Sequence, residues 1–434
     1  MYSAVVLQLR INFTRLPAPP TEDPPLTPMY DSLTTNLPHP LMAYTSFSFP
    51  PSTPLFPPAS IVQTYLESYA AHFDLKPLIR FRTTVQRAHW EPASSKWKVQ
   101  LSTGDSSDFD LIIVANGHHR VPRYPSTPGL SKWIATGKAS HSAWYRYPHY
   151  FGEVVLILGG GPSGRDIAAE MCTAALTVIH SVTGGVTEDT GNLKKRGGVV
   201  RFEDGGRVLF DDGTTESGVD YCLLATGYET SVPFLSMDTI QTGFPPACPP
   251  LPRGLYNSGY HIFPLAKQMF PLQQGYPPSS IAFMGLLVKV VPFPLLEAQG
   301  RAVMKAFEQP ASLDTTQEAV DIITRYEALR STFCDDAHSI SKNWHKFKEQ
   351  EQFAYRDRLY EFAEGDPDTR IIVPDWEKEM YGKKDVLRRA WQELEKTGKA
   401  DEWVKGVGEG GVAEWVDLMR RLLKTIEEGE RSNL

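Results

Sequence analysis

The stretch EVVLILGGGPSGRDIAAEMC, residues 153–172, decides the fold of this chain. Its VVLIL run is continuously apolar, which is typical of a strand buried on both faces of a parallel sheet, and RDIAAEM predicts the helix that follows. Between them, Gly159, Gly161 and Gly164 complete a GxGxxG pattern, whose glycines permit a tight turn, close approach of backbone to a pyrophosphate and close packing of helix on strand. The N–H groups at the helix start attract phosphate. The stretch therefore predicts dinucleotide binding, with a purely structural glycine turn as the alternative.

Two further apolar strands flank this βαβ unit along the chain, and each ends in a glycine. FDLIIVANG ends at Gly117, and VDYCLLATGYE passes through Gly227. The pair brackets the unit, so we expect an α/β fold in which one nucleotide-binding (Rossmann-like) domain is inserted into another. From about residue 317 the chain becomes helical and charged. Its charges are typical of solvated helix faces.

The strand that follows the glycine helix, ALTVIHSV, bears on the choice of coenzyme. An NAD site usually carries an acid at the end of this strand, for the ribose 2′-hydroxyl. Here Ser181 and Thr183 stand at that end, and no acid occurs before Glu188. The pattern favours NADP over NAD, although no basic residue adjoins the strand. Residues 194–196, KKR, could supply charge to a 2′-phosphate from further along the chain.

Composition excludes several classes of protein. With 434 residues, 41% of them hydrophobic and 22% charged, the chain is long enough for two globular domains. Its 44 basic and 51 acidic residues leave a net charge of −7, which gives no general attraction to nucleic acid. No apolar run reaches the roughly 18–20 residues of an integral membrane segment. The four cysteines form no CxxC pair, so we expect a reduced, cytoplasmic protein without a metal site.

Six stretches, in this order, resemble the flavin-containing monooxygenase family in its fungal, N,N-dimethylaniline monooxygenase-like form. Each is modest alone, while their order and spacing together are specific. They are MYDSLTTNLPHPLMAYTSFSFP (29–50), FDLIIVANGHHRVPRYPSTPGL (109–130), ATGKASHSAWY (135–145), GGGPSGRDIA (159–168), LLATGY (223–228) and FMGLLVKVVPFPLLEAQGRAV (283–303).

The chain departs from the family pattern in three places. The family opens with a strand–GxGxxG–helix unit that binds the FAD pyrophosphate, whereas residues 1–28 contain no glycine. Ala135 stands where the family has an aromatic residue, and Val182 and Thr183 follow Ser181 where it has a basic one. A truncated, non-catalytic NADP-binding remnant of the family is therefore the alternative to an active enzyme.

The resemblance implies an order of domains. An irregular proline-rich arm covers residues 1–28. An incomplete FAD-binding domain, without its N-terminal βαβ unit, covers 29–125 and 232–316. An NADPH-binding domain is inserted at 126–231, and a helical C-terminal extension covers 317–434.

The resemblance also implies an activity. The chain is expected to be an NADPH- and FAD-dependent monooxygenase, an oxidoreductase and flavoprotein that oxygenates a soft nitrogen or sulfur nucleophile through a C4a-hydroperoxyflavin. Its partners are then O2 and a small-molecule amine or sulfur substrate, with no nucleic acid and no membrane span. Substrate identity stays open, and so does assembly as a homo-oligomer.

Site residues follow from the resemblance position by position. Asn36 is expected to be catalytic, and His141 is expected to be a structural hydrogen-bonding residue at the domain junction rather than a proton donor. The implied cofactor-binding residues are Thr35, Asn36, Val85, Ala115, Gly117, Gly159, Gly161, Ser163, Gly164, Arg165, Asp166, Ser181, Thr226, Gly227 and Gln299.

Overall fold

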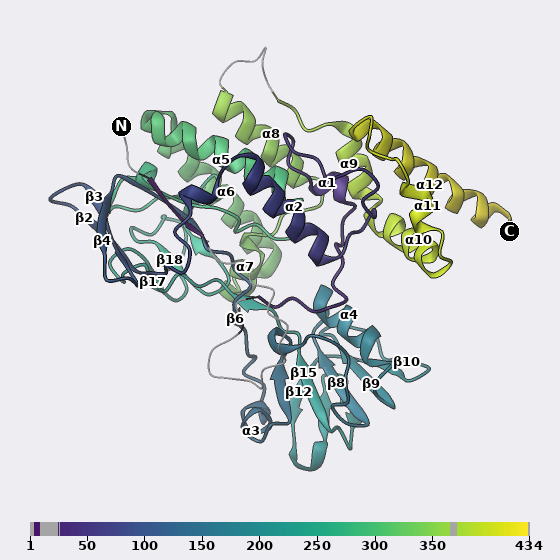
Figure 1. Cartoon of the computed structure of the whole chain (residues 1–434). Helices are drawn as coiled ribbons and strands as arrows, with labels where there is room; N and C mark the ends of the chain where they lie inside the picture. Colours follow the sequence, from purple (N-terminus) through teal and green to yellow (C-terminus); the bar gives the residue numbers. More distant parts are fainter. Residues whose placement is uncertain (1–3, 9–24, 26, 365–370, 433–434) are drawn as a thin grey trace. The chain divides into compact units, whose positions relative to one another are not determined.

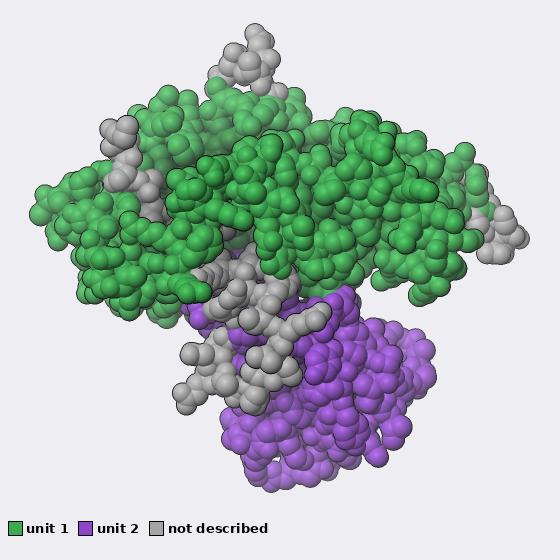
Figure 2. All heavy atoms as spheres, viewed as in Figure 1, with its two compact units in different colours: residues 1–8, 33–116, 232–434 green, residues 9–32, 117–231 purple. Residues whose placement is uncertain are grey.

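A computed structural model describes residues 4–8, 25, 27–364 and 371–432, and the chain forms two compact units (Figures 1 and 2). Unit 1 comprises Met1–Gln8, Leu33–Asn116 and Val232–Leu434, and unit 2 comprises Leu9–Ser32 and Gly117–Ser231. The chain thus leaves unit 1 at Gly117 and returns at Val232. The residues predicted as a separate helical extension, 317–434, lie within unit 1.

Unit 2 is built on a sheet with the strand order β10-β11-β9-β8-β15-β7. The central strands β8, β9 and β15 run parallel, and their apolar side chains are buried, which explains their continuously apolar sequences. Helix α4 packs against β8 and β9 (Figure 1). The bounds in unit 2 are β6 Val121–Pro122, α3 Leu130–Ala135, β7 Ala139–His141, β8 Val154–Leu158, α4 Pro162–Met171, β9 Thr177–Ser181, β10 Glu188–Thr190, β11 Leu193–Arg196, β12 Val199–Phe202, β13 Val208–Phe210, β14 Thr215–Glu216, β15 Tyr221–Leu224 and β16 Tyr228–Glu229.

Unit 1 contains a second parallel sheet, in the order β1-β5-β22. Its first strand, β1 (Ala4–Gln8), corrects the prediction of an irregular arm over residues 1–28. The backbone of β1 pairs along the whole of β5 (Leu111–Ala115), so long-range pairing orders a segment whose neighbours are rich in proline. Most of the remaining arm lies outside the described residues.

An antiparallel sheet, β2-β3-β4, packs beside the parallel one in unit 1, and helices complete the unit. Trp97 of β3 is fully buried, and its indole N–H donates to the carbonyl oxygen of Ser280. The remaining bounds in unit 1 are α1 His39–Met42, α2 Ala59–His72, β2 Val85–Glu91, β3 Lys96–Leu101, β4 Ser106–Phe109, β17 Gln241–Thr242, β18 Tyr256–Asn257, β19 Ile262–Phe263, β20 Leu265–Ala266, β21 Phe270–Pro271, β22 Ile281–Phe283, α5 Pro292–Glu308, α6 Thr315–Phe333, α7 Ala337–Trp344, α8 Glu351–Glu364, α9 Asp375–Gly382, α10 Lys384–Lys396, α11 Ala400–Val404 and α12 Val412–Ser432.

The first turn of α1 is buried against the C-terminal helices. The His39 ring lies 4.4 Å from the ring centre of Trp415 and 4.9 Å from that of Phe49, and its side chain is 1% exposed. This burial lowers the pKa of His39 to about 3, because the apolar surroundings disfavour the charged imidazolium.

Stability should therefore depend on pH through His39. The folded-state pKa is lowered, so below pH 6.5 the unfolded chain binds a proton that the folded chain does not, and stability is lost as pH falls from there toward 3. Between pH 7 and pH 5 this group should reduce the free energy of unfolding by about 2 kcal/mol. A cavity of about 30 Å³ beside the ring can accommodate the larger side chain of His39→Phe. This variant should lose about 2 kcal/mol less unfolding free energy between pH 7 and pH 5 than the unaltered chain, as measured by urea unfolding at both pH values.

The exposed His149 offers the matched control. His149→Phe should leave the pH dependence of unfolding as it is in the unaltered chain. An unchanged pH dependence in His39→Phe would contradict the assignment.

Candidate functional site

Two positions of the turn between β8 and α4 require glycine, because a side chain there would collide with backbone. Gly159 has a φ of +132°, and a Cβ placed on it would lie 2.2 Å from the carbonyl oxygen of Ala225. A Cβ on Gly164 would lie 2.0 Å from the carbonyl oxygen of Gly159. These contacts bring helix, turn and β15 closer together than any side chain allows, as the GxGxxG pattern predicts.

Gly161, by contrast, borders open space. It is the N-cap of α4 with an ordinary φ of −72°, and nothing lies within 4 Å of the position of a Cβ. Pro162 follows at the first helical position, and no side chain caps the helix, so the N–H groups of Ser163 and Gly164 have no intrahelical acceptor. An open cradle with outward N–H donors at a helix start fits the pyrophosphate of a dinucleotide.

The predicted residues Thr226 and Gly227 lie next to this turn, because the Ala225 N–H donates to the carbonyl oxygen of Leu158. The Thr226 hydroxyl donates to the Arg123 carbonyl oxygen at 2.6 Å. Gly227 has a φ of +80°. The carboxyl ends of adjacent parallel strands thus meet at the turn, which is where α/β sheets bind their ligands.

His141 has the structural role predicted for it. Its side chain is fully buried, Nε2 donates to the carbonyl oxygen of Gly227 at 3.0 Å, and Nδ1 accepts from the N–H of Ala143 at 3.1 Å. Burial lowers the pKa of His141 to about 4. Both ring nitrogens are engaged by backbone, so the ring holds the end of β15.

Helix α4 is tied by its acids to tyrosines of the same unit. Asp166 accepts a hydrogen bond from the Tyr30 hydroxyl at 2.7 Å, and Glu170 accepts from the Tyr145 hydroxyl at 2.5 Å. The Asp166 carboxylate thus has a partner in Tyr30, and its charge would repel phosphates. Its predicted place beside the coenzyme phosphates stays a prediction. Arg165, one residue earlier, is exposed.

Ser181 is also placed differently from the prediction. Its side chain is fully buried at the end of β9, and its hydroxyl donates to the carbonyl oxygen of Gly197 at 2.6 Å. Alternation along the strand turns this side chain into the core, and the predicted contact with a cofactor stays a prediction.

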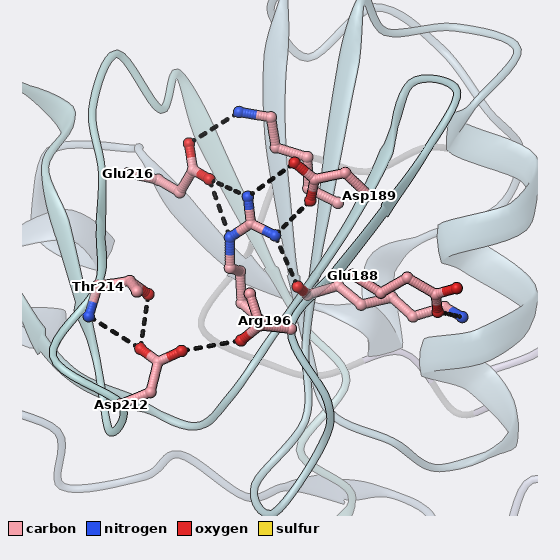
Figure 3. A network of polar contacts seen from close by, with 9 residues as sticks. Glu188, Asp189, Arg196, Asp212, Thr214 and Glu216 are labelled. Atoms are coloured by element: carbon pink, nitrogen blue, oxygen red, sulfur yellow. Dashed lines mark hydrogen bonds and ion pairs between the residues drawn. The ribbon is translucent and has the colours of Figure 1, made fainter.

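Arg196 of β11 is held between two carboxylates (Figure 3). Its guanidinium lies 2.5 Å from Asp189 and 2.6 Å from Glu216, and its side chain is 8% exposed. The hydrogen bond from Arg196 lowers the pKa of Asp189. This network joins β10, β11 and β14, and its carboxylates balance the positive charge of the arginine.

The two neighbouring lysines are also paired with carboxylates. Lys194 Nζ lies 3.0 Å from Glu216, and Lys195 Nζ lies 2.7 Å from Glu188. The suggestion that residues 194–196 supply charge to a 2′-phosphate is therefore not supported, because each cation already has an acidic partner.

The double variant Lys194→Met/Lys195→Met should accordingly change the NADP dissociation constant by less than about twofold, as expected of half-buried lysines that are already paired with acids. Arg165→Met, at a predicted phosphate-lining residue, should weaken NADP binding about tenfold by removing a charge-assisted hydrogen bond. Isothermal titration of the purified full chain with NADP compares the two variants. A tenfold loss of NADP affinity in the double variant would show that these lysines do contact the coenzyme.

One residue at the turn is not singled out by any pattern in the sequence. His180 of β9 has its Nε2 atom 2.9 Å from the carbonyl oxygen of Gly159. The signal that could have found it is an imidazole in the otherwise apolar core of TVIHS.

In unit 1, Gln299, which is expected near FAD, forms hydrogen bonds within the protein. Its side chain is fully buried, Oε1 accepts from the N–H of Gly285 at 3.0 Å, and Nε2 donates to the Tyr355 hydroxyl at 3.3 Å. Its predicted position near FAD stays a prediction. Gln299 holds the turn that follows β22.

The other predicted residues of unit 1 are spread over different elements. The Thr35 hydroxyl donates to the Leu37 carbonyl oxygen at 2.8 Å, and Asn36 is exposed. Val85 begins β2 and Ala115 ends β5, so these two belong to different sheets. Gly117, where the chain enters unit 2, has a φ of +73° and open space around it.

The fit to a flavin dinucleotide in unit 1 is partial. The parallel sheet is present, and β22 leads into Gly285, which has a φ of +73°. The sequence directly after β1, LRINFTRLPAPP (residues 9–20), contains no glycine. The glycine turn in unit 2, in contrast, has open space at Gly161 and an uncapped helix start, as a pyrophosphate site requires.

No helix in the described part of the chain has the length and apolar character needed to span a membrane. Among those same residues, no three His, Cys, Asp or Glu side chains are grouped as a metal site would require.

A family model described as Flavin-binding monooxygenase-like matches residues 21–188 and 189–372. The chain is 29% identical to flavin-containing monooxygenase FMO GS-OX-like 4 of Arabidopsis thaliana over 407 residues, which cover 88% of this chain and 82% of the relative. It is 28% identical to the thiol-specific monooxygenase of Saccharomyces cerevisiae, over 66% of this chain and 67% of the relative.

Solved structures share the fold. S-allyl-L-cysteine S-oxygenase from Allium sativum superposes with a TM-score of 0.68 at 24% identity, over 92% of this chain and 85% of its own. Tmm from a Pelagibacter strain superposes with a TM-score of 0.63 at 19% identity, over 84% and 77%. At these identities the likeness concerns the α/β fold with its two Rossmann-like domains.

Proposed function

From the premise that the chain belongs to the flavin-binding monooxygenase-like family, we propose that it uses NADPH and O2 to oxygenate a soft sulfur or nitrogen nucleophile. Family membership makes it an oxidoreductase and a flavoprotein, with FAD and NADP as its cofactors. Unit 2 is then the NADPH-binding domain and unit 1 the FAD-binding domain.

The observation that carries the proposal is the contrast between the glycines of the β8–α4 turn. Gly159 and Gly164 are needed for backbone packing, whereas Gly161 borders space that nothing in the described protein fills. A purely structural turn explains the first two and leaves the third unexplained. A bound pyrophosphate explains all three.

The roles of the chain's own groups follow from this geometry. The N–H groups of Ser163 and Gly164, with the positive end of α4, bind the coenzyme phosphates. The Asn36 amide, exposed in unit 1, hydrogen-bonds and orients the reacting cofactors. The bound flavin supplies electron transfer and activation of O2, which is why the protein needs no acid–base dyad of its own.

The overall reaction balances without another oxidant. NADPH, a proton, O2 and the substrate yield NADP⁺, water and the oxygenated substrate, so one oxygen atom goes to the sulfur or nitrogen lone pair and the other is reduced to water. The names of two relatives, a thiol-specific monooxygenase and an S-allyl-L-cysteine S-oxygenase, favour sulfur as the acceptor.

The test uses the purified full chain, supplied with FAD. We expect a bound-flavin absorbance spectrum, NADPH oxidation that a thioether stimulates, and a sulfoxide product by mass spectrometry. A chain that binds NADP but neither retains flavin nor forms product would instead be the non-catalytic remnant, which the absence of glycine after β1 favours.

Asn36→Ala should lower the yield of oxygenated product per NADPH consumed by about tenfold, the value of one lost hydrogen bond. Flavin content and the NADP dissociation constant should not change, because Asn36 is not part of the phosphate cradle. Product and NADPH are measured in the same reaction. An unchanged yield of product per NADPH would show that Asn36 is an ordinary turn residue before Pro38, without a catalytic role.

A further inference from the structure

The coenzyme turn contains three consecutive glycines, residues 159–161. Glycine restricts the backbone least, and a run of glycines loses more conformational entropy on ordering than any other sequence. The peptide planes of this turn must nevertheless keep one orientation if their N–H groups are to meet a phosphate. Something outside the turn has to hold them.

Strand β9 holds both peptides that meet at Gly159, the preceding one through its N–H and the following one through its carbonyl oxygen. The Gly159 N–H donates to the carbonyl oxygen of Ser181 at 2.9 Å, and the Gly159 carbonyl oxygen lies 2.9 Å from Nε2 of His180. The carbonyl is an acceptor only, so Nε2 of His180 carries the proton and donates it. The register of the sheet sets the ring there, because His180 pairs with Ile157, two residues before the turn.

This one side-chain hydrogen bond has a consequence for the next residue. A trans peptide is planar, with its carbonyl oxygen and the following N–H on opposite sides. Fixing the Gly159 oxygen therefore also fixes the direction of the Gly160 N–H. The same oxygen is the atom that a Cβ on Gly164 would meet at 2.0 Å, so it lies at the first turn of α4.

We infer that His180 is a positioning residue for the coenzyme: its Nε2–H locks the Gly159–Gly160 peptide so that the turn is ordered before the pyrophosphate arrives. The inference rests on the proposed binding of NADP at this turn. His180 does not touch the coenzyme, and it acts through the turn.

Three variants separate this role from simple packing. His180→Gln keeps an amide N–H at about the reach of Nε2, His180→Asn carries the same group on a shorter side chain, and His180→Leu removes the donor while keeping much of the volume. His149→Leu is the matched control, because His149 is exposed: its Nδ1 atom lies 3.1 Å from the Tyr147 carbonyl oxygen, and its ring packs on Phe151.

Two measurements are made on the full chain. Isothermal titration with NADP gives the dissociation constant, and hydrogen–deuterium exchange without nucleotide follows the amides of residues 159–165. We expect His180→Leu and His180→Asn to weaken NADP binding and to speed exchange in this segment about five- to tenfold, the value of one hydrogen bond. His180→Gln should restore most of both, and His149→Leu should change neither.

Wild-type affinity and wild-type exchange in the Leu and Asn variants would overturn the inference. An equal loss of NADP affinity in His180→Gln would also overturn it. So would a fall in the melting temperature of the Leu and Asn variants large enough to explain their weaker binding. If the unaltered chain itself binds no NADP, the proposed function fails, and the inferred role in coenzyme positioning fails with it. Faster exchange in the variants would then show only that the hydrogen bond orders the turn.

Discussion

Gly164→Ala is expected to lower the free energy of unfolding by about 3 kcal/mol, the upper range for overpacking a closed site. The added methyl would lie 2.0 Å from the Gly159 carbonyl oxygen and 3.4 Å from the Ala225 Cβ. The first of these neighbours is backbone, which cannot turn aside as a flexible side chain can. Helix α4 must then move away from β8, and the NADP cradle moves with it. Urea unfolding and NADP titration measure the two effects.

Gly161→Ala is the control within the same turn. Its φ of −72° suits alanine and no atom lies within 4 Å of the new methyl group, so unfolding should change by less than about 1 kcal/mol, the usual difference between glycine and alanine at an N-cap. NADP affinity should still fall at least about tenfold, because the methyl occupies the space assigned to the pyrophosphate. A Gly161→Ala protein that binds NADP normally would contradict the assignment of this turn.

Arg356→Met is expected to destabilise the chain by about 3–5 kcal/mol, as breaking a buried ion pair does. The Arg356 side chain, on α8, is 1% exposed, and its guanidinium lies 2.6 Å from the carboxylate of Glu377 on α9, which is 8% exposed. Removing the arginine leaves a carboxylate buried without its counter-charge. Thermal or urea unfolding would show the loss.

Two comparisons isolate the buried charge. Lys396→Met breaks the exposed pair with Glu393 and should cost less than about 1 kcal/mol. Arg356→Met/Glu377→Met removes both buried charges and should recover most of the stability lost in the single variant. A double variant as unstable as Arg356→Met would show that lost packing, rather than the unpaired carboxylate, is responsible.

The elements that could be predicted from sequence are those whose signal is local. The run from Val154 to Leu158 is apolar because both faces of its strand are buried, and the glycines that follow are required by backbone contacts a few residues away. Strand β1 escaped prediction, since its order comes from pairing with β5, more than a hundred residues further along the chain.

Several polar residues predicted to bind a cofactor have a hydrogen-bond partner on another segment of the protein, and their predicted roles stay predictions. Ser181 bonds to Gly197, Asp166 to Tyr30 and Gln299 to Gly285. A motif indicates which residue types occur at a position, but it does not indicate which neighbour satisfies each polar group once the chain has folded.

By itself, the order of residues determined that this protein contains a strand–glycine–helix unit for a dinucleotide, because turn geometry and strand burial depend on neighbours in sequence. Only the tertiary structure decided which side chains stay available to a ligand and which are paired within the protein. The carboxylates that face Arg196 and the imidazole that faces Gly159 are paired in this way. The physical reason is that a buried polar group must be paired, and its partner is chosen by proximity in space.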